Sequence, residues 1–218
     1  MNDQAMQTYW QGKLERTGEV LESNNFAVWL AGDASEANSI FWKEIYPEIK
    51  PKSVSFGGSL SLRATGLYDE LMAESGLEVI DTYATGLSMD EVIDRRRRSL
   101  LVDCFMTGTN AVTKEGHLIN LDGMGNRVAA LTFGPKHVVL FIGRNKLVAD
   151  LDEAISRIKE YAAPVNTIRL GRNTPCAQTM QCEDCKSPER ICNTWTITEK
   201  SNPPQRVKIV LINQDLGY

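Results

Sequence analysis

The chain has 218 residues, of which 42% are hydrophobic and 24% are charged, and its formal net charge is -4. This length and apolar content predict one large domain with short appendages, because such a chain can bury a sizeable core. The acidic balance argues against nucleic acid as a partner, since no excess of positive charge is present to attract a phosphate backbone.

The distribution of apolar residues along the chain also argues against a membrane or secreted protein. No uninterrupted apolar run approaches the roughly 20 residues that a bilayer-spanning helix needs, so we expect no membrane insertion. The segment Met1–Gln4 contains no basic region followed by an apolar stretch, which predicts a cytoplasmic protein.

Apolar runs alternate with helical patterns through the first half of the chain. Residues 3–24 carry apolar side chains at helical spacing and predict a leading helix. The run Phe26–Ala31 predicts a buried strand, and Asp33 followed by Glu36 has the form of a helix start, so a helix is expected over 34–49. The same alternation predicts strands at 53–56 and 78–83 and helices near 60–75 and 89–101.

The second half continues this pattern and then changes in composition. Strands are expected at 104–107, 118–121, 137–142 and 207–212, and a helix over 151–162. Buried strands separated by helices predict an α/β fold with a mostly parallel sheet. We expect an N-terminal helix over 1–25, an α/β domain over 26–165, and a cysteine-rich loop with a closing strand over 166–218, packed on the same domain.

Four of the five cysteines lie close together near the end of the chain. Cys176, Cys182, Cys185 and Cys192 have the spacing C-x5-C-x2-C-x6-C, and four thiols this close can surround one metal centre. One CxxC pair flanked by single cysteines is nearer to iron–sulfur loops than to the paired CxxC knuckles of a zinc ribbon. We therefore predict an iron–sulfur cluster, with structural zinc as the alternative and unligated thiols as the third reading.

Three turns rich in small residues follow predicted strands, at 57–59, 107–110 and 123–127. In an open parallel sheet such turns lie at the carboxyl edge, where backbone N–H groups favour an anionic ligand. The alternative is that each glycine simply serves a tight turn. The residues predicted to bind the ligand are Gly57, Gly58, Ser59, Thr107, Gly108, Thr109, Asn110, Asn120, Asp122, Gly123, Gly125, Asn126 and Arg127.

Arg96 is added to the predicted ligand-binding residues because of its place on a helix. It falls between Val92, Ile93 and Leu100 on the apolar stripe, where an unpaired charge is costly. Its guanidinium either extends along the apolar surface to water, or reaches a buried acid or an anionic ligand.

Two familiar enzyme sites are not supported by the sequence. The stretch from Gly123 imitates a dinucleotide fingerprint, but Val128 occupies the third glycine position and no acid ends a following strand, so nicotinamide binding is rejected. His117 and His137 are far apart and lack a serine–acid or HExxH pattern, which argues against a histidine-based hydrolase.

Several stretches resemble the LUD-domain family of lactate-utilisation proteins: residues 57–59, 107–113, 116–129 and 173–176. The resemblance implies a fold similar to the sugar-isomerase and coenzyme A transferase superfamily, a three-layer α/β/α sandwich. It also implies a role in oxidising lactate to pyruvate, with other lactate-utilisation iron–sulfur subunits as partners. It provides no catalytic residue.

Three functions of different classes follow from these observations. The first is a redox component, with a cluster in the cysteine loop and with a glycine-rich edge that binds a small anion such as lactate or a phosphorylated ligand. The second is an isomerase or transferase acting on a phosphorylated or coenzyme A-linked substrate, with a structural loop. The third is an assembly or ligand-sensing subunit without turnover, containing structural zinc.

Overall fold

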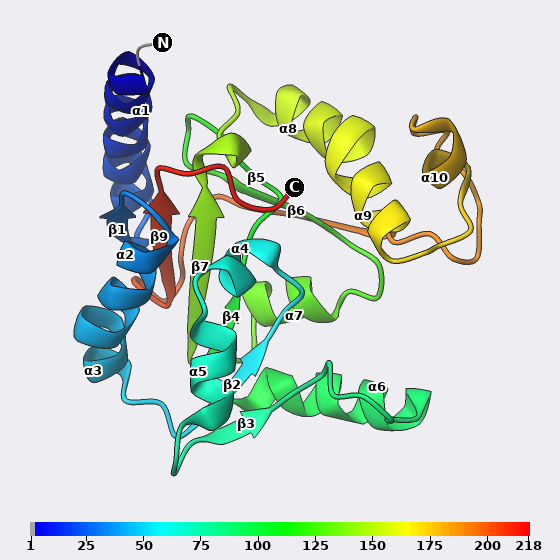
Figure 1. Ribbon diagram of the computed structural model, residues 1–218, viewed down its shortest axis with the longest axis horizontal. Coiled ribbons are helices and arrows are strands. Elements are labelled where there is room, and N and C mark those ends of the chain that lie inside the picture. Colours follow the sequence, from blue (N-terminus) through cyan, green and yellow to red (C-terminus); the bar gives the residue numbers. More distant parts are fainter. Residues whose placement is uncertain (1–2) are drawn as a thin grey trace.

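The computed structural model describes residues 3–218, which form an α/β fold in three layers (Figure 1). Its main sheet has six parallel strands in the order β1-β9-β7-β4-β2-β3. The strands are β1 Ala27–Ala31, β9 Val207–Ile212, β7 His137–Gly143, β4 Cys104–Thr107, β2 Ser53–Phe56 and β3 Glu78–Ile80. This arrangement confirms the predicted α/β/α sandwich with a mostly parallel sheet.

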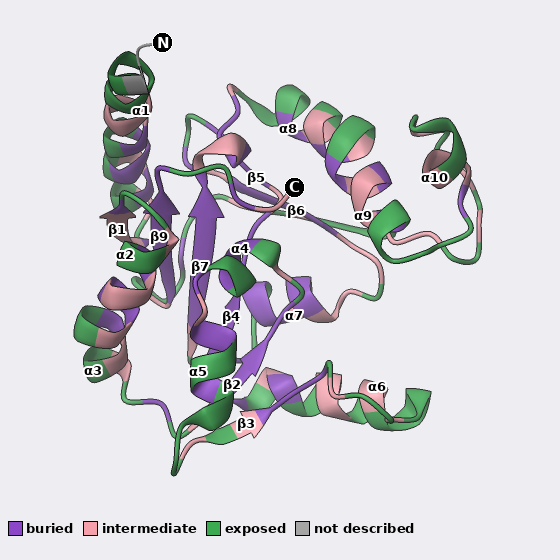
Figure 2. Ribbon diagram, viewed as in Figure 1, coloured by how far each residue is buried: buried purple, intermediate pink, exposed green. Residues whose placement is uncertain are grey.

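The two faces of the main sheet bury different side chains of the same strands. In β7, Val139 and Phe141 pack into one apolar cluster, whereas Val138 and Leu140 pack into another. This alternation is the period of two that every strand imposes, and it explains why these strands read as continuous apolar runs. Figure 2 accordingly shows β9, β7 and β4 buried along their length.

Helices cover both faces of this sheet. The leading helix α1 Asp3–Ser23 packs on one face through Leu14 and Leu21, and α7 Asn126–Thr132 lies on the same face. The other face is covered by α2 Ala34–Ile40, the turn η1 Phe41–Ile45, α3 Tyr46–Ile49, α4 Leu60–Ala64 and α5 Leu67–Ala73. The predicted start of α2 is confirmed, because Asp33 Oδ1 accepts a hydrogen bond from Glu36 N at 2.9 Å.

A second, antiparallel sheet of three strands lies beside the main sheet. It consists of β5 Ala111–Val112, β6 Leu118–Asp122 and β8 Thr194–Thr198, in that order. The helical segment α8 Leu151–Arg157, η4 Ile158–Ala162 and α9 Ala163–Arg169 covers this sheet through Ala154 and Ile158. The sequence did not predict β8. In this short strand threonines alternate with Trp195 and Ile197, and the strand is too exposed to contain an apolar run.

The cysteine-rich region begins later than predicted, whereas its closing strand has the predicted bounds. Asn166, where the loop was expected to begin, lies inside α9. The helix tolerates Pro164 because this residue is in its first turn, where the missing N–H costs no hydrogen bond. The closing strand β9 is inserted between β1 and β7 in the main sheet. The remaining helical segments are α6 Met89–Arg98, η2 Ser99–Leu101, η3 Arg144–Lys146 and α10 Pro175–Thr179. Over residues 3–218, no helix has the length and apolar character needed to cross a membrane.

Candidate anion-binding site

A cavity of about 740 Å³ opens beyond the carboxyl ends of β2 and β4. Its walls come from the turns after these strands, the turn before α7, the end of α9 and the segment 188–193. In Figure 1 the C-terminus and α9 lie above α4 and α7, around this edge of the sheet. The volume falls within the range of about 300–1,000 Å³ that is usual for small-molecule sites.

The structure brings most of the predicted ligand-binding residues to this one cavity. Those that line it are Gly57, Gly58, Ser59, Arg96, Gly108, Thr109, Asn110, Asp122, Gly123, Asn126 and Arg127. Thr107 and Asn120 are buried behind the lining, and Gly125 begins α7 with a positive φ of 90°. The structure thus places these residues together, and the binding of a ligand by them stays a prediction.

Two glycines allow the turns after β2 and β4 to touch. A Cβ atom added at Gly57 would lie 2.5 Å from Thr107 Oγ1, and one added at Gly108 would lie 2.7 Å from Ser59 Oγ. Both distances are well inside van der Waals contact, so any side chain at these positions would separate the turns. The glycines therefore set the close approach of backbone that forms the floor of the cavity.

Arg127 is engaged on every side by the protein itself. Its Nη1 donates to Asn120 Oδ1 at 2.5 Å and to Gly108 O at 3.3 Å, and its Nη2 donates to Asn110 Oδ1 at 2.9 Å. Its Nε lies 3.5 Å from Asp122 Oδ1. Burial lowers the pKa of Arg127, and the charge of Asp122 opposes that effect. Because its donors are used within the protein, we assign Arg127 to positioning the turns rather than to direct contact with a ligand.

Lys146 lies in η3, directly after the carboxyl end of β7, and it also lines the cavity. Its side chain is 5% exposed, and its Nζ donates to Ser61 Oγ at 3.0 Å. Burial lowers its pKa to about 7, with the charges of Arg157 and Arg127 adding to the effect. The cavity therefore contains an amine that changes its charge near neutral pH.

Arg96 is half-buried and lines the cavity. Its Nη1 lies 3.2 Å from Met124 Sδ, and among the described residues no acceptor meets its buried Nε. Its contact with an anionic ligand stays a prediction. The buried acid that the sequence allowed as its partner is absent from the ion pairs of residues 3–218.

The lining of the cavity is strongly cationic although the whole chain is acidic. Its basic residues are Arg63, Arg96, Arg127, Lys146, Arg169, Arg172 and Arg190, and its acidic side chains are Asp122 and Glu189. Charges of one sign gathered in a concave site attract ligands of the opposite sign. The arrangement is therefore suited to holding a molecule with one or more negative charges.

Sequence reasoning missed Lys146, Tyr83 and the arginines of α9 and its following turn. Tyr83 stands beside Gly58, where an added Cβ would lie 3.0 Å from its hydroxyl. These residues have no shared local motif. One signal was available, because Lys146 follows a predicted strand of the parallel sheet, and such positions meet at the carboxyl edge.

The four clustered cysteines do not converge in this structure. Over residues 3–218, no group of three or more His, Cys, Asp or Glu side chains is placed to hold a metal ion. Cys176 Sγ instead lies 3.3 Å from Thr174 Oγ1, and Arg190 donates to the main-chain carbonyls of Cys185 and Cys192. The arrangement present does not fit a four-thiolate centre, and the iron–sulfur cluster or zinc stays a prediction.

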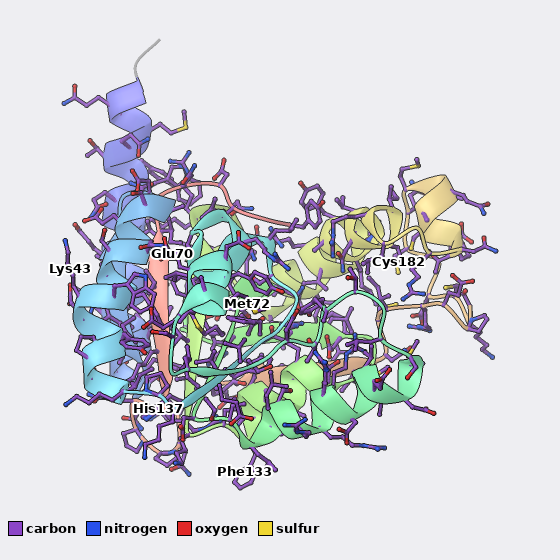
Figure 3. The ribbon with its side chains drawn as sticks, turned by 60° about the horizontal axis from the view of Figure 1, so that its bottom comes forward. Lys43, Glu70, Met72, Phe133, His137 and Cys182 are labelled. Carbon is purple, nitrogen blue, oxygen red and sulfur yellow. The ribbon has the colours of Figure 1, made fainter. Side chains whose placement is uncertain are left out.

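The cysteine segment also lies at one end of the molecule. Figure 3 places Cys182 near α9 and α10, at the opposite end from His137 at the start of β7. The neighbouring segment 188–193 nevertheless lines the cavity, so the cysteines and the candidate site share a stretch of chain.

The fold and the cavity together define a class: an α/β/α protein with a cavity lined by cationic side chains at the carboxyl edge of a parallel sheet. Residues 14–212 match the LUD domain. The chain therefore belongs to the LUD domain family, which confirms the resemblance found in its sequence and relates it, at the level of the family, to lactate-utilisation proteins. No curated protein matches the chain.

A solved structure supports the fold. A crystal structure described as a DUF162 family protein from Deinococcus radiodurans is similar, with a TM-score of 0.52 and 16% sequence identity. The likeness covers 93% of this chain and 98% of that one. At this identity it is evidence for the architecture alone.

Proposed function

We propose that the protein acts in lactate utilisation and binds a small anionic ligand in the cavity at the carboxyl edge of its sheet. The observation that carries this proposal is a pair of cavity-lining cations, Lys146 and Arg96, which have no carboxylate within 4.0 Å among residues 3–218. Removing a cation from water without a partner is unfavourable. An anionic ligand would supply that missing partner.

A thermal unfolding assay with a panel of anions tests the proposal. Lactate, pyruvate and inorganic phosphate are each compared with sodium chloride of equal ionic strength. A ligand at a hundredfold excess over its dissociation constant stabilises the folded state by about 2.7 kcal/mol, so a binding anion raises the melting temperature by several degrees. Lys146→Met should reduce this rise, whereas Lys114→Met, which removes an exposed lysine, should not. A panel that leaves the wild-type melting temperature unchanged contradicts the proposal.

We also propose that the protein works alongside iron–sulfur subunits that oxidise lactate to pyruvate, and that its cysteine loop binds a metal once the four thiols move together from the separate positions they have in this structure. Family membership and the spacing of the four cysteines support this part. A cluster, when bound, would supply electron transfer. Iron, zinc and acid-labile sulfide are measured on anaerobically prepared protein, and a preparation without stoichiometric metal contradicts this part and leaves the anion site unaffected.

One observation favours a second candidate, an isomerase or transferase with a larger substrate. A three-carbon acid fills a small part of a cavity of about 740 Å³, and the basic side chains at 169, 172 and 190 lie along the same lining. A phosphorylated or coenzyme A-linked molecule would use both the volume and the additional cations. Tighter binding of coenzyme A or a sugar phosphate than of pyruvate, in the same assay, selects this candidate.

A further inference from the structure

Lys146 has unused bonding capacity at the wall of the cavity. A lysine ammonium has three N–H donors, and the hydrogen bond to Ser61 Oγ occupies one of them. Ser61 in turn donates its hydroxyl proton to Leu216 O at 3.0 Å, so toward Lys146 it acts as the acceptor. Within residues 3–218 no other acceptor and no carboxylate is found for Nζ.

The residue at position 108 leaves space near this amine. A Cβ atom built on Gly108 would lie 3.6 Å from Nζ, so any larger residue would place its side chain in contact with the amine. Gly108 and Lys146 both line the cavity. A molecule in the cavity can therefore approach the nitrogen past the backbone of the turn after β4.

A structural role alone does not explain this arrangement. A lysine that braces a fold usually extends its charge to water or pairs it with an acid, and Lys208 does the latter by donating to Glu48 Oε1 at 2.7 Å. Lys146 has neither solution. Its pKa of about 7 means that about half of the molecules have a neutral, nucleophilic amine at that pH.

We propose that Lys146 forms an imine with the carbonyl group of an anionic carbonyl compound, either a 2-oxo acid or a keto-phosphate, bound in the cavity. The carbonyl group is inferred from the nucleophilic amine, with which it can react, and the negative charge is inferred from the cationic lining, which would attract it. Lysines placed among other cations or removed from water perform this chemistry in other proteins. The inference rests on the proposed function, because it assumes that the cavity binds an anion.

The step balances without an oxidant or a reductant. The nitrogen lone pair of Lys146 attacks the carbonyl carbon, which forms a C–N bond. The C–O bond then breaks, and the oxygen leaves as water with the two protons of the amine. The Ser61 hydroxyl, already hydrogen-bonded to Nζ, is placed to assist the movement of these protons.

Reductive trapping tests the inference on the full chain. The protein is incubated at pH 7 with sodium cyanoborohydride and either pyruvate or dihydroxyacetone phosphate, and modified lysines are located by peptide mass mapping. We expect one carboxyethyl group from pyruvate, or the corresponding reduced adduct from the phosphate, on Lys146. Modification there should be on the order of a hundredfold faster than on the exposed Lys114, because far more of the Lys146 amine is neutral at this pH. The probe that labels Lys146 shows whether the site takes a 2-oxo acid or a keto-phosphate.

Two controls separate the imine from simple anion binding. Lactate has no carbonyl to react and acetone has no charge, so neither should label Lys146 selectively. Lys146→Arg and Lys146→Met should both lose the selective adduct, and mapping of the wild-type chain needs no variant to fold. Calorimetric titration of both probes without reductant measures binding separately.

The outcomes are distinguishable. Binding without selective labelling overturns the imine and leaves the proposed function intact. Absence of both binding and labelling overturns both. Labelling spread evenly over surface lysines, or unchanged in Lys146→Arg, also overturns the imine.

Discussion

The guanidinium of Arg127 donates to Asn120 Oδ1 at 2.5 Å, at a position where Asn120 is 1% exposed. This contact joins the first turn of α7 to β6. The same guanidinium reaches Asn110 in the turn after β4, so one side chain holds together two of the three turns that meet at the cavity. Arg127 therefore braces the site, and its predicted contact with a ligand stays a prediction.

Replacing Arg127 with methionine should destabilise the fold. The substitution removes one hydrogen-bond donor from the amide oxygen of Asn120 and one from that of Asn110, and it leaves Asp122 without its ion pair. Breaking such a buried network costs about 3–5 kcal/mol. Urea denaturation measures the loss, and Arg97→Met, on the exposed side of α6, should change stability by less than about 0.5 kcal/mol. If the two variants have equal free energies of unfolding, the contacts of Arg127 do not stabilise the fold.

Gly57→Ala tests whether the two turns must touch. The new Cβ would lie 2.5 Å from Thr107 Oγ1, and we expect a cost of about 1–3 kcal/mol together with weaker anion binding. Gly12→Ala in α1 is the matched control, since the nearest heavy atom to its Cβ is 4.0 Å away. In that helix alanine should stabilise the protein by about 0.5–1 kcal/mol. A Gly57→Ala protein as stable as wild type contradicts the close approach.

The buried amine of Lys146 predicts a specific pH dependence of stability. Its folded pKa of about 7 lies below the unfolded value of about 10.4, so between these pH values the unfolded chain binds one more proton. Stability of wild type relative to Lys146→Met should therefore rise from pH 7 toward pH 10, by about 1.4 kcal/mol per pH unit. Below pH 7 both states are protonated and the difference should be flat. The free energy of unfolding of the exposed-lysine variant Lys114→Met, measured by denaturation over the same range, should follow that of wild type. If the stability difference between wild type and Lys146→Met does not change with pH, Lys146 is not a buried amine with a lowered pKa.

Substitution of the CxxC pair separates a metal from the core. Cys182→Ser together with Cys185→Ser should abolish any bound iron or zinc while the circular dichroism of the α/β core is retained, because both cysteines lie outside the apolar clusters. Cys104→Ala is the control: Cys104 is fully buried in β4, where burial raises its pKa to about 12, so it remains a protonated thiol and its loss should not change metal content. Unfolding of the double variant at moderate temperature would show instead that the metal staples the fold.

Local patterns predicted most of the main sheet. The run Phe26–Ala31, the run at 137–142 and the closing strand at 207–212 all became parallel strands, and the last two are buried strands, which read as continuous apolar segments. The first was predicted to be buried, but β1 is an edge strand and is mostly half-buried. The position of β9 between β1 and β7 could not be read in the same way, since strand order depends on contacts between distant segments. The short, exposed β8 gave too weak a pattern to be recognised.

The candidate site was predictable where its residues follow strands in glycine-containing turns. Ser59 and Gly108 were found by that rule, and they lie against each other in the structure. Lys146 and the arginines after 168 were not found, because a basic residue in a loop is ordinarily a solvated one. What sets them apart is that they line one cavity, and Lys146 is in addition buried; neither property is visible in the order of residues along the chain.

Binding of an anion in the cationic cavity can be measured by calorimetric titration of wild type, Arg96→Gln and Arg97→Gln with pyruvate and with inorganic phosphate. These neighbouring arginines differ in that Arg96 lines the cavity and Arg97 does not. We expect saturable binding of at least one anion to wild type and to Arg97→Gln, and affinity on the order of tenfold weaker for Arg96→Gln, the expected loss of a charge-assisted hydrogen bond. If neither anion gives binding heat, or if all three proteins bind with equal affinity, the cavity is not an anion site that uses Arg96.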